Sequence, residues 1–231
     1  MRIGVFAYNF HHKKTQEGLF HLLASGYKIE CILAADPVEL KFYQSKMRIS
    51  PKGLFYFHPD AIAKRFSIPY HVVVHNSTAC HDLIKKYNLD VGIVLGARIL
   101  RESVIKSFKI GVLNMHPGLL PENRGLDTIK WAIINNIKQG VSCHMISREI
   151  DRGELIMKRP IDVYDDDTLL DIFLRIQNTE QTMMVESLKL IESGCVTEPV
   201  GVGNYSRAVP PEAEAILEER FSEYKKVYNS L

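Results

Sequence analysis

Two polar side chains, Asn114 and His116, follow an apolar run and could take part in acyl-transfer or acid–base chemistry. A side-chain amide such as that of Asn114 can donate a hydrogen bond to a developing oxyanion without changing its charge. A histidine side chain such as that of His116 ordinarily gives and recovers a proton near neutral pH, which suits general acid–base chemistry. Two prolines and two glycines make the following loop, residues 117–125, rigid. The sequence therefore predicts a site on this loop.

A third candidate, Asp151, lies 35 residues after His116 in the turn-like sequence Glu-Ile-Asp-Arg-Gly. If this turn folds back across the sheet edge, the carboxylate would favour the charged form of the imidazole. The residues alone leave an alternative open, which is that Asp151 is an ordinary turn aspartate.

Other groups of polar residues favour structural roles. His71 and His75 lie in a strand-like sequence, where about 13 Å would separate them, too far to chelate one ion. The run 165–167 of aspartates precedes a helix and complements its dipole. The basic loop 11–14 could meet a phosphate, but solvation is the favoured reading. No metal is predicted, and three further histidines are expected to be hydrogen-bonded structural residues: His58, His81 and His144.

The elements that must position the site alternate along the chain. Apolar runs predict strands at 2–7, 28–35, 70–74, 90–95, 110–113, 141–146 and 155–163. Helical periodicity predicts helices at 15–25, 59–66, 77–87, 102–108, from 127 or 128 with Asp127 or Thr128 as the cap, 167–193 and 213–228. This alternation predicts an α/β fold with a mostly parallel sheet, whose chemistry lies at the carboxyl ends of the strands.

Two segments interrupt or follow this pattern. In the irregular stretch 36–58, four aromatic residues either line a pocket or cover the core, and covering is favoured: Tyr43, Phe55, Tyr56 and Phe57. The expected domains are a catalytic domain at 1–200 and a C-terminal tail at 201–231. The apolar stripe of the tail helix is expected to pack on the body: Leu217, Phe221, Tyr224 and Tyr228.

Composition restricts the class of ligand. The 231 residues carry a formal net charge of only +2, so no strong field points to nucleic acid or a membrane surface. Four cysteines without a Cys-x-x-Cys motif predict free thiols in a reducing compartment. We expect a cytoplasmic protein with a small-molecule ligand.

The spacing of these motifs resembles the folate-dependent formyltransferase family. The resemblance covers about residues 90–163 and rests on Asn114-x-His116-Pro117-x-Leu119-Leu120-Pro121, Arg124-Gly125 and Asp151-x-Gly153. Ser142 and His144 also match a Ser-x-His strand that is frequent in the family, whereas Gly118 and Asn123 depart from its more usual Ser and bulky residues.

The resemblance implies a Rossmann-like domain with helices on both faces of the sheet and a short C-terminal extension. It implies catalysis by Asn114, His116 and Asp151 without a metal. The formyl donor, 10-formyltetrahydrofolate, would bind near the segment 98–100 and the turn before Asp151, at residues Arg98, Ile99, Leu100, Ser147 and Ile150.

The resemblance does not identify the amine acceptor, but differences from individual branches of the family reduce the number of candidate acceptors. The first loop, Ala7-Tyr8-Asn9-Phe10-His11, lacks the glycines that hold the phosphate in glycinamide ribonucleotide formyltransferase. From the 231 residues we expect neither the β-barrel of the transfer-RNA enzyme nor an N-terminal domain of the deformylase kind. We expect a nucleotide-linked amino sugar as acceptor, no nucleic acid or membrane partner, and leave a homodimer open. The alternatives are another amine, such as glycinamide ribonucleotide, hydrolysis of the donor, or a binding protein that has lost catalysis.

Overall fold

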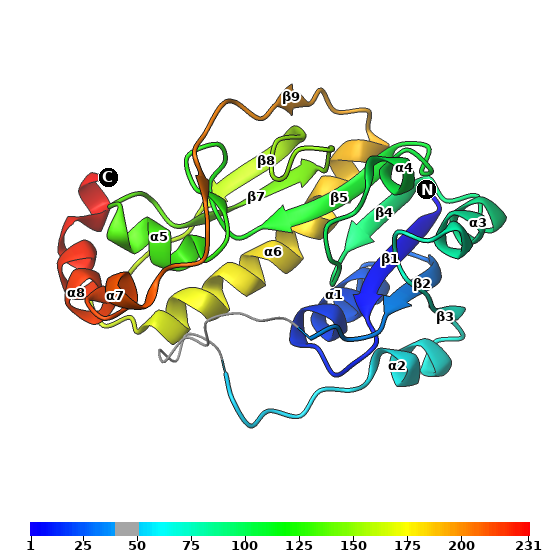
Figure 1. Cartoon of the computed structure of the whole chain (residues 1–231), viewed down its shortest axis with the longest axis horizontal. Helices are drawn as coiled ribbons and strands as arrows, with labels where there is room; N and C mark the ends of the chain where they lie inside the picture. The colour runs from blue at the N-terminus through cyan, green and yellow to red at the C-terminus, as the bar shows by residue number, and fades with distance from the viewer. Residues whose placement is uncertain (40–50) are drawn as a thin grey trace.

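An eight-stranded sheet forms the centre of the computed structural model, which describes residues 1–39 and 51–231 (Figure 1). The strand order is β3-β2-β1-β4-β5-β7-β8-β9. The pairs from β3 to β5 are parallel, and those from β5 to β9 are antiparallel. The strands are β1 (Ile3–Tyr8), β2 (Ile29–Ala35), β3 (Tyr70–Val72), β4 (Val91–Val94), β5 (Gly111–His116), β7 (Gly140–Met145), β8 (Glu154–Pro160) and β9 (Glu198–Pro199).

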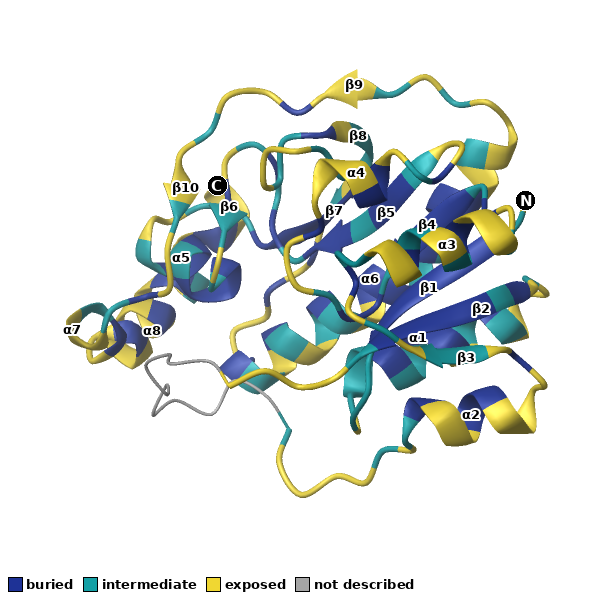
Figure 2. Ribbon diagram, turned by 45° about the vertical axis from the view of Figure 1, so that its right-hand side comes forward, coloured by how far each residue is buried: buried dark blue, intermediate teal, exposed yellow. Residues whose placement is uncertain are grey.

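Helices cover both faces of this sheet because neighbouring strand residues point to opposite sides. Phe6 on β1 packs in one apolar cluster with α3 and α4, whereas Val5 packs in the other with α1, α2, α5, α6 and α8. The helices are α1 (Lys13–Ala24), α2 (Pro59–Arg65), α3 (Thr78–Lys86), α4 (Glu102–Ile105), α5 (Thr128–Ile134), α6 (Leu169–Glu192), α7 (Pro211–Glu214), α8 (Leu217–Val227) and a final 3₁₀ turn, Tyr228–Ser230. Figure 2 shows the buried central strands between these layers. The predicted Rossmann-like α/β fold is confirmed.

The C-terminal tail lies against the body, as predicted from its apolar stripe. The tail passes beside α5 before α7 and α8 (Figure 1), and all four stripe residues belong to a core cluster. The phenol of Tyr224 donates to the carbonyl of Ile137 at 2.6 Å, and that of Tyr228 donates to Ile161 at 2.6 Å. The predicted single helix at 213–228 is instead divided into α7 and α8.

The aromatic residues of the irregular stretch do not all cover the core. Phe55 and Phe57 are 76% and 51% exposed, so the covering prediction is wrong for these two. Their rings contact each other, and the Phe55 ring contacts that of His11. Tyr43 lies outside the described residues.

Gly153 is required where β8 begins, because a Cβ there would lie 1.7 Å from the carbonyl oxygen of Met145. We expect Gly153→Ala to lower the free energy of unfolding by roughly 1–3 kcal/mol, as overpacking does elsewhere. Urea-induced unfolding measures this. The matched control is Gly201→Ala, whose Cβ would make an ordinary 3.4 Å contact with Pro121. Equal stability of the two variants would contradict the steric explanation.

In the described part of the chain, no helix is long and apolar enough to span a membrane. No group of three or more His, Cys, Asp or Glu side chains among those residues is arranged to hold a metal ion.

Candidate active site

Strand pairing brings three polar side chains together at the sheet. On β5, Asn114 and His116 point to the same face because they are two residues apart. The antiparallel neighbour β7 places His144 opposite Asn114 and Ser142 opposite His116. The Nδ2 atom of Asn114 lies 3.2 Å from Nε2 of His144, and the two imidazole ring centres are 6.4 Å apart.

His116 is fixed by the loop that follows it. Its Nε2 donates to the carbonyl of Asn123 at 2.8 Å. A Cβ at Gly118 would lie 2.5 Å from that carbonyl oxygen and 3.0 Å from His116 Nε2. The departure from the more usual Ser at this position therefore suits the local packing, and Nδ1 of His116 is left to face the site.

The turn containing Asp151 folds back to these residues. Its Oδ1 lies 3.6 Å from Nδ1 of His116 and 3.9 Å from Nε2 of His144. These separations exceed a direct hydrogen bond but are short enough for strong charge interaction in a nearly buried site. The Asp151 side chain is 12% exposed and His116 is 5% exposed. The sequence left open whether Asp151 is an ordinary turn residue or a carboxylate that folds back to His116. In the structure it lies in the turn and also faces His116.

His144 is buried and hydrogen-bonded, as predicted, and one of its partners is the candidate catalytic residue Asn114. Its ring is fully buried, and burial is the main cause that lowers its pKa to about 4, with the neighbouring His116 adding to the effect. The neutral ring donates through Nδ1 to the Met145 carbonyl at 3.2 Å, so Nε2 accepts from the Asn114 amide. His144 therefore orients Asn114 and leaves the second N–H of that amide for a ligand.

Acid is expected to destabilise the protein through His144. The unfolded chain binds a proton at this residue below about pH 6.5, whereas the folded chain does so only near pH 4. The free energy of unfolding should therefore fall by about 3 kcal/mol as pH drops through this window and level off below it. Chemical denaturation across pH 4–7 measures the slope. His144→Asn should show a smaller slope, and an unchanged slope would contradict the assignment.

All five residues expected near the formyl donor line one hollow of about 210 Å³. The side chains of Asn114 and Asp151 line the same hollow. Its walls include apolar residues from β4 and from the end of β7, and the five expected residues are Arg98, Ile99, Leu100, Ser147 and Ile150. The structure thus brings the predicted donor segment and the predicted catalytic residues into one place.

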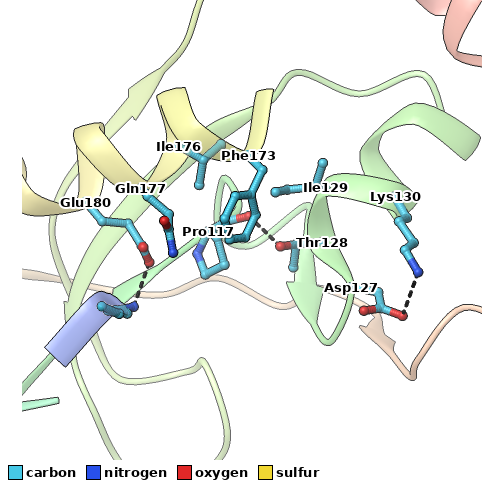
Figure 3. Close-up of a pocket in the computed structure, with 10 residues that line it drawn as sticks. Pro117, Asp127, Thr128, Ile129, Lys130, Phe173, Ile176, Gln177 and Glu180 are labelled. Carbon is cyan, nitrogen blue, oxygen red and sulfur yellow. Dashed lines mark hydrogen bonds and ion pairs between the residues drawn. The ribbon is translucent and has the colours of Figure 1, made fainter. Parts of the chain in front are cut away.

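Two more hollows adjoin this one. A larger hollow of about 640 Å³ shares Arg98, Ile99 and Ile150 with the donor-side hollow and is also lined by Tyr205 of the tail. It shares Asp127 and Lys130 with a third, of about 270 Å³. In this third hollow Phe173 and Gln177 of α6 lie near Pro117, and Glu180 of the same helix pairs with Lys14 (Figure 3). A connected surface therefore runs from the donor-side hollow to α6.

Asp127 takes the predicted N-cap position of α5 with φ of +51°, but its side chain does not make the capping hydrogen bond. Its carboxylate instead accepts the backbone N–H of Val209 at 2.9 Å, and the Thr128 hydroxyl donates to the Pro117 carbonyl. Both side chains tie the site loop to other segments.

The other polar groups have local partners. Lys14 forms an ion pair with Glu180 at 2.7 Å, and burial, with Lys14 nearby, lowers the pKa of His12 to about 4. His71 and His75 bond separate partners, the Tyr87 hydroxyl and the Leu33 carbonyl. His58 and His81 are hydrogen-bonded as predicted, to Asp60 and Ser107. Asp167 forms an ion pair with Arg175 at 2.7 Å, and the predicted complement to the helix dipole stays a prediction.

Comparison with protein families matches residues 50–188 to the formyl transferase model. A methionyl-tRNA formyltransferase of Agathobacter rectalis is 32% identical over 119 residues, covering 51% of this chain and 38% of that protein. That of Fusobacterium nucleatum is 33% identical over 113 residues, covering 48% and 36%. The chain therefore matches less than half the length of these relatives.

Solved structures share the fold at low identity. A phosphoribosylglycinamide formyltransferase from Anaplasma phagocytophilum superposes with a TM-score of 0.65 at 20% identity, covering 90% of this chain and 99% of that chain. A 4-N formyltransferase from Francisella tularensis gives a TM-score of 0.65 at 17% identity, covering 95% and 87%. Since the family model spans more than half of the sequence, this chain belongs to the formyl transferase family.

Proposed function

We propose that this protein transfers a formyl group from 10-formyltetrahydrofolate to a primary amine on a small molecule, namely an amino sugar linked to a nucleotide. One observation carries the proposal. Asn114, His116 and Asp151 converge beside a hollow lined by the expected donor-binding residues. Family membership supports formyl transfer as the reaction class.

The site has the groups that such a transfer needs. In the proposed step, the amine nitrogen bonds to the formyl carbon, whose oxygen becomes an oxyanion that accepts a hydrogen bond from the Asn114 amide. The bond from that carbon to the folate nitrogen then breaks. The proton lost by the amine passes through His116 to the leaving nitrogen, so the enzyme ends the cycle unchanged.

Asp151 would assist this proton transfer by its charge. In the neutral ring, Nε2 of His116 carries the proton given to Asn123, so Nδ1 is the atom that gains and loses the catalytic proton. The carboxylate of Asp151 lies 3.6 Å from that atom, so its negative charge can stabilise the positive charge that the ring carries during proton transfer. Because 3.6 Å exceeds a direct hydrogen bond, Nδ1 is not bonded to the carboxylate and keeps its lone pair for the transferred proton.

The donor-side hollow suits a flat, mainly apolar ring with polar edges. Leu100 and Val94 supply apolar walls, and Ile150 is a wall from the turn. Residues of the segments 97–100 and 146–151 line the same space, and polar groups among them can bond a ring edge. A pterin has these properties, and the fit supports the folate donor.

The larger hollow supports a small, anionic acceptor. Its volume of about 640 Å³ is in the range of small-molecule sites. The exposed Arg98 can pair with phosphate oxygens. The phenol of Tyr205 can bond a sugar hydroxyl, and that of Tyr8, which donates to the Ala97 carbonyl at 2.9 Å, can accept from one. The net charge of +2 is low for a protein that binds the polyanion transfer RNA.

Incubation with 10-formyltetrahydrofolate and a panel of acceptors tests this proposal, with mass spectrometry of the products. The panel contains nucleotide-linked amino sugars, glycinamide ribonucleotide, methionyl-tRNA and a reaction without amine. A formyl group on an amino sugar supports the proposal. If only another acceptor were formylated, the proposed amino-sugar acceptor would be wrong and formyl transfer would stand. Release of formate without an amine would identify a hydrolase. A donor that stays intact in every reaction would overturn formyl transfer itself.

A further inference from the structure

A two-residue strand of the site loop is clamped by the C-terminal tail. Strand β6 (Arg124–Gly125) pairs in parallel with β10 (Tyr205–Ser206), which lies far along the chain. The N–H of Leu126 donates to the Ser206 carbonyl at 2.9 Å and extends this pairing. The β6–β10 clasp, as we name these four residues, is separate from the main sheet.

The clasp contacts the turn that carries Asp151. The backbone N–H of Gly125 donates to Asp151 Oδ2 at 3.1 Å. The guanidinium of Arg124 donates through Nε to the Ile150 carbonyl at 2.8 Å and through Nη1 to the Gly203 carbonyl at 3.1 Å. Arg124 thus connects the carboxylate turn with the tail.

Steric restrictions show that this arrangement is specific. Gly125 has φ of +107°, and a Cβ there would lie 2.1 Å from the Ser206 carbonyl oxygen. Asp151 itself has φ of +50°, in the left-handed region that L-residues rarely adopt. Such a backbone persists only where its surroundings hold it, and the clasp supplies two of those hydrogen bonds.

We propose that Arg124 and Gly125, held by β10, are positioning residues that set the Asp151 carboxylate against His116 and His144. The inference rests on the proposed function, because it takes Asp151 as the group that assists proton transfer. Of the two oxygens of Asp151, Oδ2 is held by Gly125 and Oδ1 faces both imidazoles. Without the hydrogen bond from Gly125 to Oδ2, the carboxylate could rotate and Oδ1 would no longer be held toward the two imidazoles. The tail would then be part of the catalytic apparatus rather than a cover for the core.

Arg124→Met tests this inference, since it retains the apolar stem and removes both hydrogen bonds. Arg124→Lys is the milder second variant. Arg207→Ala is the matched control, because it removes an exposed arginine from the tail that β6 pairs with. The single tryptophan, Trp131, donates to the Arg207 carbonyl at 2.6 Å, so its fluorescence reports whether the tail remains docked.

The decisive signal is the ¹⁵N and ¹³C spectrum of the His144 ring at pH 7, which needs no substrate. We expect Arg124→Met to shift these signals while circular dichroism stays native, and Arg124→Lys to shift them less. Turnover should fall by about 100-fold in Arg124→Met, the cost of misplacing a catalytic group, and stay within about twofold of the wild type in Arg207→Ala, which touches no site group.

Unchanged His144 signals in a folded Arg124→Met or Arg124→Lys protein would overturn the inference, whatever the activity. If Arg124→Met does not fold, Arg124→Lys decides by the same signals. Failure of the wild-type protein to transfer formyl would instead count against the proposed function. In that case, the spectra would still show whether the clasp positions Asp151.

Discussion

His116→Ala is expected to lower kcat for formyl transfer by about 100- to 10,000-fold, the usual contribution of a positioned acid–base group. The imidazole is nearly buried, its Nε2 is fixed by the Asn123 carbonyl, and its Nδ1 faces Asp151. Alanine removes the atom that would carry the proton to the leaving nitrogen. Steady-state rates with 10-formyltetrahydrofolate and the acceptor found by the panel measure the effect.

His81→Ala is the matched control for this loss, because His81 bonds Ser107 between α3 and α4 and lies outside the three hollows. It should keep turnover within a few-fold of the wild type, as substitutions away from a site usually do. Circular dichroism establishes that both variants are folded. Near-normal turnover of a folded His116→Ala protein would remove His116 from the proposed reaction.

The backbone pattern of the site could be predicted because it depends on local sequence. The apolar run before Asn114 predicts a buried strand. Because alternate residues of a strand point to opposite faces, Asn114 and His116 lie on one face. The two prolines predict the rigid loop that follows. The amphipathic stripe of the tail predicts packing through Leu217 and Tyr224, because burial of apolar side chains stabilises the folded chain in any topology.

The rest of the site depends on contacts between distant segments, which periodicity does not encode. The sequence predicts a hydrogen-bonded structural His144 but not its partner, because the register of β5 with β7 places it against Asn114. The nearest signal was its position on the strand next to the site. The clasp has even less signal, since two-residue strands have no periodicity. Asp127 resembles a helix cap by sequence, yet the tail supplies Val209 as a better-placed donor for its carboxylate.

Asn114→Ala is expected to lower kcat by about 100- to 1,000-fold, as loss of one oxyanion donor does in other acyl-transfer sites. His144 accepts one N–H of the Asn114 amide, so the amide is held before any substrate arrives. A prearranged donor stabilises charge in the transition state more than in the bound substrate. The loss should therefore appear in kcat, with the KM values for donor and acceptor within about threefold of the wild type, since ground-state binding is little affected.

Asn114→Asp distinguishes loss of the amide hydrogen-bond donor from loss of side-chain volume. The two side chains have nearly the same shape, but a carboxylate would replace the amide donor and repel the oxyanion, so Asn114→Asp should be at least as slow as Asn114→Ala. Asn178→Ala, exposed on α6, is the control and should leave turnover unchanged. If Asn114→Asp retained most of the wild-type rate, the oxyanion role would be wrong, and the hydrogen bond to His144 would then have only a structural purpose.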